Sequence, residues 1–191
     1  FGTGGKVTTT GTAGTDRLYA VAAYPGGRIL AAGETRNSAN TSTDFGLARY
    51  NANGTLDTSF GTGGLVTLSP AGTNSEFVYS VIVLPDGKIL AAGEANSDAA
   101  IVRLHANGSY DFTFGSNGRT VVPILAGIDT IYGITLQPDG KIVAAGRTYN
   151  GSNYDIAVLR FLENGLLDTS FDGDGKLIIP YGTGDDYGRA I

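Results

Sequence analysis

Carboxylates recur at one position of this sequence and are its first candidates for chemistry. Asp16, Glu76 and Asp129 each precede a tyrosine by three residues, and Asp185 and Asp186 lie near the equivalent place later in the chain. Brought together, they would form a partial ring of carboxylates that holds a divalent cation such as calcium or binds a basic partner. The alternative is that they are solvated loop carboxylates at strand starts.

A second candidate group combines aromatic rings with amides. Tyr149, Asn150, Asn153 and Tyr154 stand close together, and rings and amides of this kind suit stacking and hydrogen bonding to a protein or a glycan. We expect them to form a binding site.

Two other motifs resemble functional sites but lack residues that those sites require. Asp168, Asp172 and Asp174 resemble part of a calcium loop, but the alternating ligands and the later Glu of such a loop are missing, which favours an Asx-rich turn. His105 is the one histidine and there is no cysteine, so a Ser-His-Asp or Cys-His site is excluded within this segment. We assign no catalytic residue and no metal ligand.

Composition narrows the class of protein. Hydrophobic residues make up 41% and charged residues 16%, which predicts a folded chain, and the absence of Cys excludes disulfides. A net charge of -5 with 13 scattered Lys and Arg argues against nucleic acid as a partner. No apolar run is long enough for membrane insertion. The acidic, Thr-, Asn-, Ser- and Gly-rich composition suits an extracellular or cell-surface bacterial protein.

An internal repeat must position these residues. The segment that begins at Phe1 returns at Phe60, Phe114 and Phe171, which divides the chain into repeats at 1–59, 60–113, 114–170 and a partial repeat at 171–191. We interpret 1–191 as one partial domain.

Each repeat predicts four short strands and no helix. A strand ends in a Pro-Gly-Gly or Pro-Asp-Gly turn, a second strand ends at a glycine, a third precedes an Asn-Gly turn, and a fourth follows a pair of turn residues ending in Gly. The first strand is apolar on both faces and the fourth carries Lys and Thr. This pattern predicts an all-β fold of β-propeller blades, each of four antiparallel strands, with a parallel β-helix as the alternative.

The expected blades are staggered against the sequence repeats. We place three complete blades at 18–69, 77–124 and 131–180, with an outer strand at 6–10 and the start of an inner strand at 187–191 left over. Because propellers close with about four to eight blades, we expect part of a larger propeller, completed by blades from a longer chain or an assembly.

Two positions hold the same residue in every blade, whereas one class of loop differs in length from blade to blade. Arg49, Arg103 and Arg160 share a position, as do Asp57, Asp111 and Asp168, and we expect both sets to be scaffold. The segments 34–43, 94–97 and 147–154 differ in length and should share a face with the three candidate acids. We call this the variable-loop face, and we expect charge reversal of those acids to leave thermal stability nearly unchanged.

The blocks PDGKILAAG at 85–93 and LARYNANGTLDTSFG at 47–61 resemble the delta-60 repeat of bacterial proteins, and the resemblance extends over the whole chain. It implies a β-propeller repeat of large exported or surface proteins whose biochemical role is mostly unassigned. We therefore expect a non-enzymatic binding or structural module that recognises a protein or a glycan through the variable-loop face. The alternatives are a carbohydrate-active hydrolase with paired carboxylates and a subunit of a surface filament or assembly.

Overall fold

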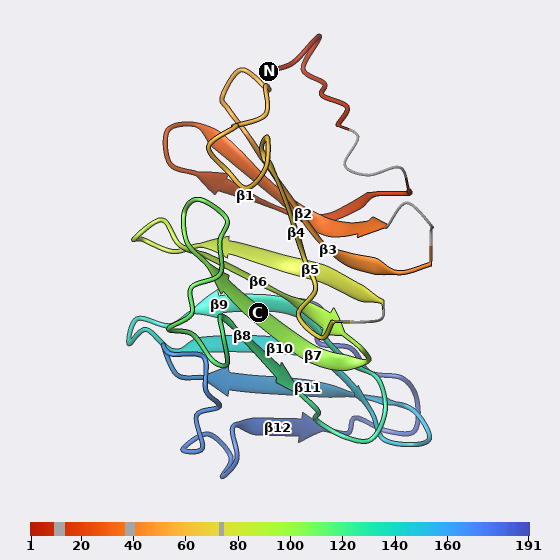
Figure 1. The fold of residues 1–191 in the computed structure, drawn as a ribbon. Coiled ribbons are helices and arrows are strands. Elements are labelled where there is room, and N and C mark those ends of the chain that lie inside the picture. Colours follow the sequence, from red (N-terminus) through yellow and green to blue (C-terminus); the bar gives the residue numbers. More distant parts are fainter. Residues whose placement is uncertain (10–13, 37–40, 73–74) are drawn as a thin grey trace.

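The structure is a computed structural model that describes residues 1–9, 14–36, 41–72 and 75–191. These residues form three four-stranded antiparallel sheets, which follow one another along the chain (Figure 1). The first contains β1 (Arg17–Tyr24), β2 (Arg28–Arg36), β3 (Thr43–Tyr50) and β4 (Leu65–Leu68). The second contains β5 (Glu76–Val83), β6 (Ile89–Ala95), β7 (Asp98–Leu104) and β8 (Arg119–Val122). The third contains β9 (Asp129–Leu136), β10 (Ile142–Tyr149), β11 (Tyr154–Phe161) and β12 (Lys176–Ile179).

The strands of each sheet pair in sequence order, from β1 to β4, from β5 to β8 and from β9 to β12. This confirms the prediction of an all-β protein built from four-stranded antiparallel blades. None of the described residues forms a helix that is long and apolar enough to cross a membrane.

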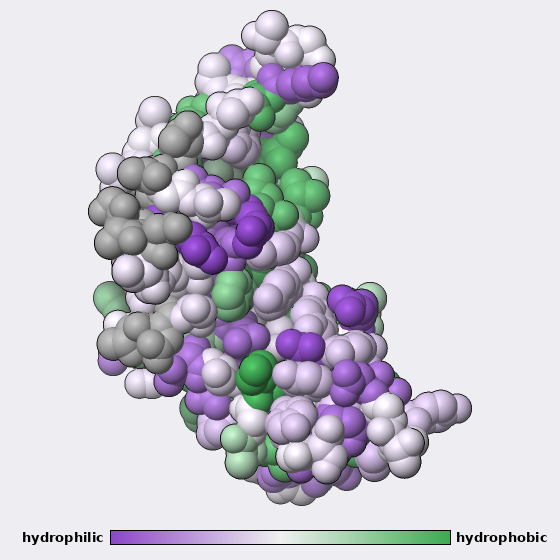
Figure 2. Space-filling model, turned by 90° about the vertical axis from the view of Figure 1, so that its right-hand side faces the viewer, coloured by the Kyte–Doolittle hydropathy of each residue, from purple (hydrophilic) through white to green (hydrophobic). Residues whose placement is uncertain are grey.

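The hydrophobic core lies between the blades. One cluster, which includes Leu30, Phe45 and Ile89, joins the first blade to the second, and another, which includes Leu90 and Ile142, joins the second to the third. The inner strands β1, β5 and β9 contact one another in turn. Each blade therefore buries its faces against its neighbours, and Figure 2 shows the resulting stack as a curved body with a hollow side.

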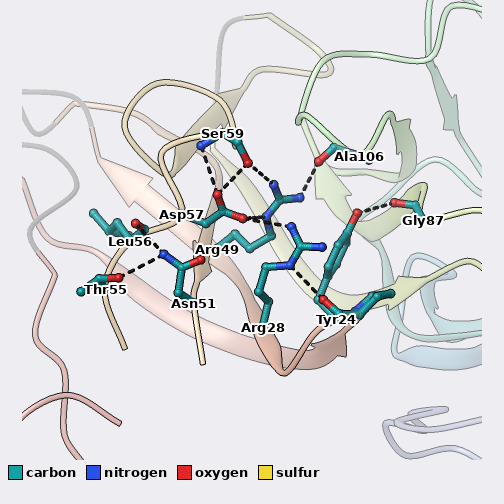
Figure 3. A network of polar contacts seen from close by, with 11 residues as sticks. Tyr24, Arg28, Arg49, Asn51, Thr55, Leu56, Asp57, Ser59, Gly87 and Ala106 are labelled. Carbon is teal, nitrogen blue, oxygen red and sulfur yellow. Dashed lines mark hydrogen bonds and ion pairs between the residues drawn. The ribbon is translucent and has the colours of Figure 1, made fainter. Parts of the chain in front are cut away.

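An arginine in the third strand of each blade ties that blade together, and Figure 3 shows the one in the first blade, Arg49. In the first blade Arg49 Nε donates to Asp57 Oδ2 at 2.8 Å, and Arg49 Nη2 donates to Ser59 Oγ at 3.1 Å. The hydrogen bond from Ser59 holds the pKa of Asp57 well below its usual range, so the carboxylate stays charged. Arg103 with Asp111 and Arg160 with Asp168 repeat this ion pair at 2.8 and 2.7 Å. The scaffold role expected for these positions is confirmed.

The same arginine also reaches the next blade. Arg49 Nη1 donates to the Ala106 carbonyl oxygen, and Arg103 Nη1 donates to the Glu163 carbonyl oxygen at 2.6 Å. Phe60 and Phe114, each beneath its arginine, are 0% exposed. We call the arginine, its aspartate and its phenylalanine the interblade latch. In the part of the chain that the structure describes, the third latch, at Arg160, has no blade opposite it.

The Asn-Gly turns of the second and third blades each receive the latch of the blade before them. Gly115 N donates to the Asn164 carbonyl oxygen at 2.7 Å, and Phe114 lies against Gly165. A Cβ at Gly165 would come within 2.6 Å of the Phe114 ring, and its φ of +85° also favours glycine. This close approach explains why each repeat keeps Gly at this turn.

Both leftover segments differ from the expectation. Residues 6–9 form no strand beyond a bridge between Thr3 and Lys6, and residues 187–191 form none; Thr10 lies outside the described residues. A strand needs a run of backbone hydrogen bonds to a neighbour, whereas Gly188 N makes one such bond, to the Gly146 carbonyl oxygen at 3.0 Å. Gly2 N instead donates to the Asn53 carbonyl oxygen at 2.7 Å. A groove of about 320 Å³ lies between residues 7–9 and the first sheet.

The variable loops are shorter than predicted, because β2, β6 and β10 continue to pair through Arg36, Ala95 and Tyr149. The second connection is only Asn96-Ser97, both with positive φ as in a tight hairpin turn. The third consists of residues 150–153, and residues 37–40 of the first lie outside the described residues.

Candidate functional site

Three tyrosines on the inner strands occupy β-bulges. The pairing of β1 with β2 breaks between Leu18 and Ala20, and that of β5 with β6 breaks between Val78 and Ser80. In the third blade, Ala145 of β10 pairs with Gly133 of β9 and the next residue, Gly146, pairs with Ile131. The skipped residues are Tyr19, Tyr79 and Tyr132. Because a bulged residue has no partner on the neighbouring strand, its side chain departs from the regular alternation between the two faces of the sheet.

The glycine of the Ala-Ala-Gly motif, which lies within the second strand of each blade, permits this bulge. A Cβ at Gly93 would lie 1.8 Å from the Phe77 carbonyl oxygen, and one at Gly33 would lie 1.9 Å from the Arg17 carbonyl oxygen. Gly146 has the same relation to Thr130 at 1.8 Å. No side chain fits at such distances. The repeated Ala-Ala-Gly therefore specifies the bulge and, through it, the direction of the tyrosine.

The bulged tyrosines contact one another from blade to blade. The ring centroids of Tyr19 and Tyr79 are 5.1 Å apart and those of Tyr79 and Tyr132 are 5.3 Å apart, with the rings tilted at 45° and 59°. Tyr19 is 42% exposed, and the other two are half-buried. Burial raises the pKa of Tyr79 and of Tyr132 further above neutral pH, where a tyrosine phenol is already protonated and can donate a hydrogen bond. We call Tyr19, Tyr79 and Tyr132 the tyrosine ladder.

The residue after each bulge glycine carries a charge beside the ladder. Glu34 accepts a hydrogen bond from Arg17 at 2.8 Å. Glu94 accepts one from the Thr130 hydroxyl at 3.0 Å. Burial raises the pKa of Glu94, while the bond from Thr130 opposes that shift. In the third blade the position holds Arg147, whose guanidinium carbon lies 4.0 Å from the ring centroid of Tyr154.

Arg147 joins the ladder to the tyrosines predicted from the sequence. Its guanidinium carbon is 5.7 Å from the Tyr132 centroid, and the Tyr154 ring lies 5.1 Å from Tyr149 and 5.9 Å from Tyr187. The structure therefore brings Tyr149 and Tyr154 together and connects them to the ladder. We call the ladder with Tyr149, Tyr154, Tyr187 and Arg147 the aromatic array.

Asn150 and Asn153 are engaged within their own loop. Asn150 Nδ2 donates to Asp155 Oδ2 at 2.8 Å and to Asn153 Oδ1 at 3.0 Å, and Asn150 Oδ1 accepts from Ser152 N at 2.9 Å. Asn153 Nδ2 donates to the Gly184 carbonyl oxygen. These amides shape the loop that holds the two tyrosines. Ligand binding by the amides stays a prediction, and it would require these bonds to be exchanged.

The three candidate acids lie on the variable-loop face, as expected, since Glu76 pairs with Ala95 and Asp129 pairs with Thr148. The expectation of an accessible ring is nevertheless wrong for two of them, because Glu76 and Asp129 are 0% exposed. Asp16 alone is exposed, and it accepts a hydrogen bond from the Thr35 hydroxyl at 2.6 Å.

Each buried acid holds the connection that leads into its own strand. Glu76 Oε1 accepts from Ala71 N at 2.8 Å and from Gly72 N at 3.1 Å, and Asp129 Oδ2 accepts from Ile124 N at 2.6 Å. Burial raises the pKa of both carboxyl groups even though these bonds oppose the shift. Within the described ranges, no group of three or more acidic or histidine side chains could hold a metal ion.

Sequence reasoning missed the ladder as a unit and missed Arg147. A signal for the ladder was present, because one repeat position holds Tyr19, Tyr79 and Tyr132. A signal for Arg147 was present too, because the Ala-Ala-Gly of the other two complete repeats is followed by Glu34 and Glu94. A bulge, however, cannot be recognised from side-chain alternation alone, since the extra residue shifts that alternation by one.

Comparison with known families agrees with this architecture. The profile of a family described as a domain of unknown function (DUF5122) beta-propeller matches residues 25–60, 84–114 and 137–171. Each match covers the second and third strands of one blade and ends at the Phe of the repeat. The comparison with curated proteins gives no match. The matches support the expected propeller repeat but not the delta-60 name. Since they cover just over half of the sequence, the chain belongs to the DUF5122 beta-propeller family.

Proposed function

We propose that the chain is a non-enzymatic binding module of a bacterial surface or secreted protein, and that it binds a glycan through the variable-loop face. The observation that carries this proposal is the aromatic array. Its rings run from Tyr19 to Tyr149, with the Arg147 guanidinium joining Tyr132 to Tyr154. They remain partly exposed on the face where the loops vary between repeats.

The array has the chemistry that saccharides require. A sugar ring offers a face of C–H groups that stacks on an aromatic ring, and its hydroxyls pair with polar tips such as phenols and guanidinium groups. Tyr79 and Tyr132 stay protonated, so each supplies a donor beside its ring. The bulges and the contacts between rings also fix the array in advance, which lowers the entropic cost of binding.

The carboxylates beside the array favour binding over hydrolysis. Hydrolysis of a glycoside needs two carboxyl groups that reach the scissile bond. Here Glu34 is paired with Arg17 and Glu94 with the Thr130 hydroxyl, so both already serve neighbouring side chains. The composition, which is acidic and rich in Thr, Asn, Ser and Gly, supports a surface or secreted location.

The proposal is tested by screening the 191-residue chain against an array of bacterial and host glycans and measuring the dissociation constant of the best ligand by calorimetry. We expect Tyr79→Leu and Tyr132→Leu to weaken binding at least tenfold. Tyr181→Leu is the matched control, because Tyr181 is 80% exposed and lies outside the array. Thermal unfolding of each variant establishes that it is folded.

Three results would contradict the proposal. Ligand binding that survives both ladder substitutions would place the site elsewhere. The absence of any glycan ligand together with capture of a defined protein would favour a protein partner. Shortened saccharides released during incubation, detected by chromatography, would make the protein a hydrolase.

A further inference from the structure

One position of the repeat changes the sign of its charge. The residue after the bulge glycine is Glu34 in the first blade and Glu94 in the second, but Arg147 in the third. Scaffold residues of a repeat protein recur from unit to unit, as the latch arginines do here. A departure at a position that faces the aromatic array therefore points to recognition by the third blade in particular.

The guanidinium group of Arg147 lies among tyrosine rings. Its guanidinium carbon lies 4.0 Å from the Tyr154 centroid, 5.3 Å from Tyr187 and 5.7 Å from Tyr132. Arg189 lies against two of the same rings, 5.1 Å from Tyr187 and 5.3 Å from Tyr132. The two guanidinium groups are thus within reach of one short oligosaccharide.

Neither guanidinium has an acidic partner. Across residues 1–9, 14–36, 41–72 and 75–191, neither Arg147 nor Arg189 has an ion pair within 4.0 Å, whereas all three latch arginines have one. The hydrogen bond from Arg147 Nε to the Thr130 hydroxyl is long, at 3.5 Å. Glu94 is near enough for Arg147 to lower its pKa, but the two side chains are not bonded.

A guanidinium group that stacks on aromatic rings and makes no ion pair can bind an anion. Its planar fork matches the two oxygens of a carboxylate, and stacking on aromatic rings leaves its edge N–H groups available. Arg147 is half-buried, so an ion pair made there would be screened less than one on the open surface.

We propose that Arg147 and Arg189, with Tyr132, Tyr154 and Tyr187, form a subsite for a carboxylate-bearing sugar such as a uronic acid. The guanidinium groups bind the carboxylate and the tyrosines stack on the sugar ring. This inference rests on the proposed glycan-binding function and names the class of glycan.

The test compares an oligogalacturonate with its methyl-esterified form, which keeps the sugar rings and loses the charge. Calorimetry with the 191-residue chain should show at least tenfold tighter binding of the acid, with an affinity that falls as salt is added. Arg147→Gln should remove most of this preference, because it should weaken binding of the acid at least tenfold more than binding of the ester. Arg119→Gln, on the outer strand β8, is the control arginine and should retain the preference.

The outcomes separate the inference from the function on which it rests. If both forms bind equally to the unaltered chain, or if only the ester binds, the glycan-binding function stands and the acidic subsite is refuted. Equal weakening of both forms by Arg147→Gln would assign this arginine to holding the tyrosines in place, which also refutes the subsite. Binding of neither form, with no other glycan bound in the screen, would overturn both.

Discussion

Arg103→Ala tests whether the blades are held together by the interblade latch. The Arg103 side chain is 9% exposed and that of Asp111 is 2% exposed, and Nε lies 2.8 Å from Oδ2. Removing one partner of a buried ion pair costs about 3–5 kcal/mol because the other charge is left without compensation. Lys88, whose Nζ is 3.2 Å from Asp111, remains and offsets part of that loss.

The substitution also removes the hydrogen-bond donor that Arg103 directs at the next blade. The Glu163 carbonyl oxygen loses a charge-assisted hydrogen bond, a contact worth about 1.5–3 kcal/mol in its own right. The two contributions share one guanidinium and do not simply add. We therefore expect the free energy of unfolding to fall by about 3–5 kcal/mol, measured by urea denaturation at pH 7.

Arg160→Ala is the matched control within the same molecule. Arg160 makes the same pair with Asp168 at 2.7 Å, and Lys141 lies 3.0 Å from that carboxylate as Lys88 does from Asp111. The side chain of Arg160 is 21% exposed, and in the described part of the chain it makes no bond to another blade. We expect a clearly smaller loss. If Arg160→Ala costs as much as Arg103→Ala, the reasoning about the latch is wrong.

Three further comparisons test the bulge and the buried acids. Gly93→Ala would place a Cβ 1.8 Å from a carbonyl oxygen, so we expect a large fall in Tm. Gly184→Ala is the control and should leave Tm unchanged, because a Cβ there would have nothing within 4 Å. Equal Tm values for the two variants would refute the bulge argument. Burial raises the pKa of Glu76 above its usual 4.5, so stability should rise as pH falls from 7 toward 4.5, and Glu76→Gln should flatten this rise in urea titrations. Asp129→Lys should lower Tm more than Asp16→Lys does, because only Asp129 is buried, and the reverse order would contradict this.

The blades were predictable because their determinants are local. The Pro-Asp-Gly turn before Lys88 sets a hairpin, and the Asn-Gly turn at 107–108 returns the chain after the third strand. These signals recur in each repeat, with Pro-Gly-Gly in place of Pro-Asp-Gly in the first, so one correct assignment gives all three blades. The scaffold role of Arg49 and Asp57 followed from the same repetition.

Burial of the acids was not predictable, because it depends on contacts outside the strands. Glu76 is covered by a connection whose Ala71 and Gly72 amides turn back onto its carboxylate. Nothing in the residue types indicates whether such a connection lies over the acid or away from it. The same holds for Asn150, whose amide is taken up by Asp155 across the loop.

The aromatic array shows how one backbone can carry different chemistry in each blade. The bulge needs only a glycine opposite it, so the tyrosine direction is kept in all three blades while the next residue is free to vary. Glu34 and Arg147 occupy the same backbone position, yet one is neutralised by Arg17 and the other lies among rings without an ion pair in the described residues. Substitution at this position changes the charge of the variable-loop face and leaves the bulge and the interblade latch intact. The residues that hold the fold are therefore separate from those that we propose for recognition.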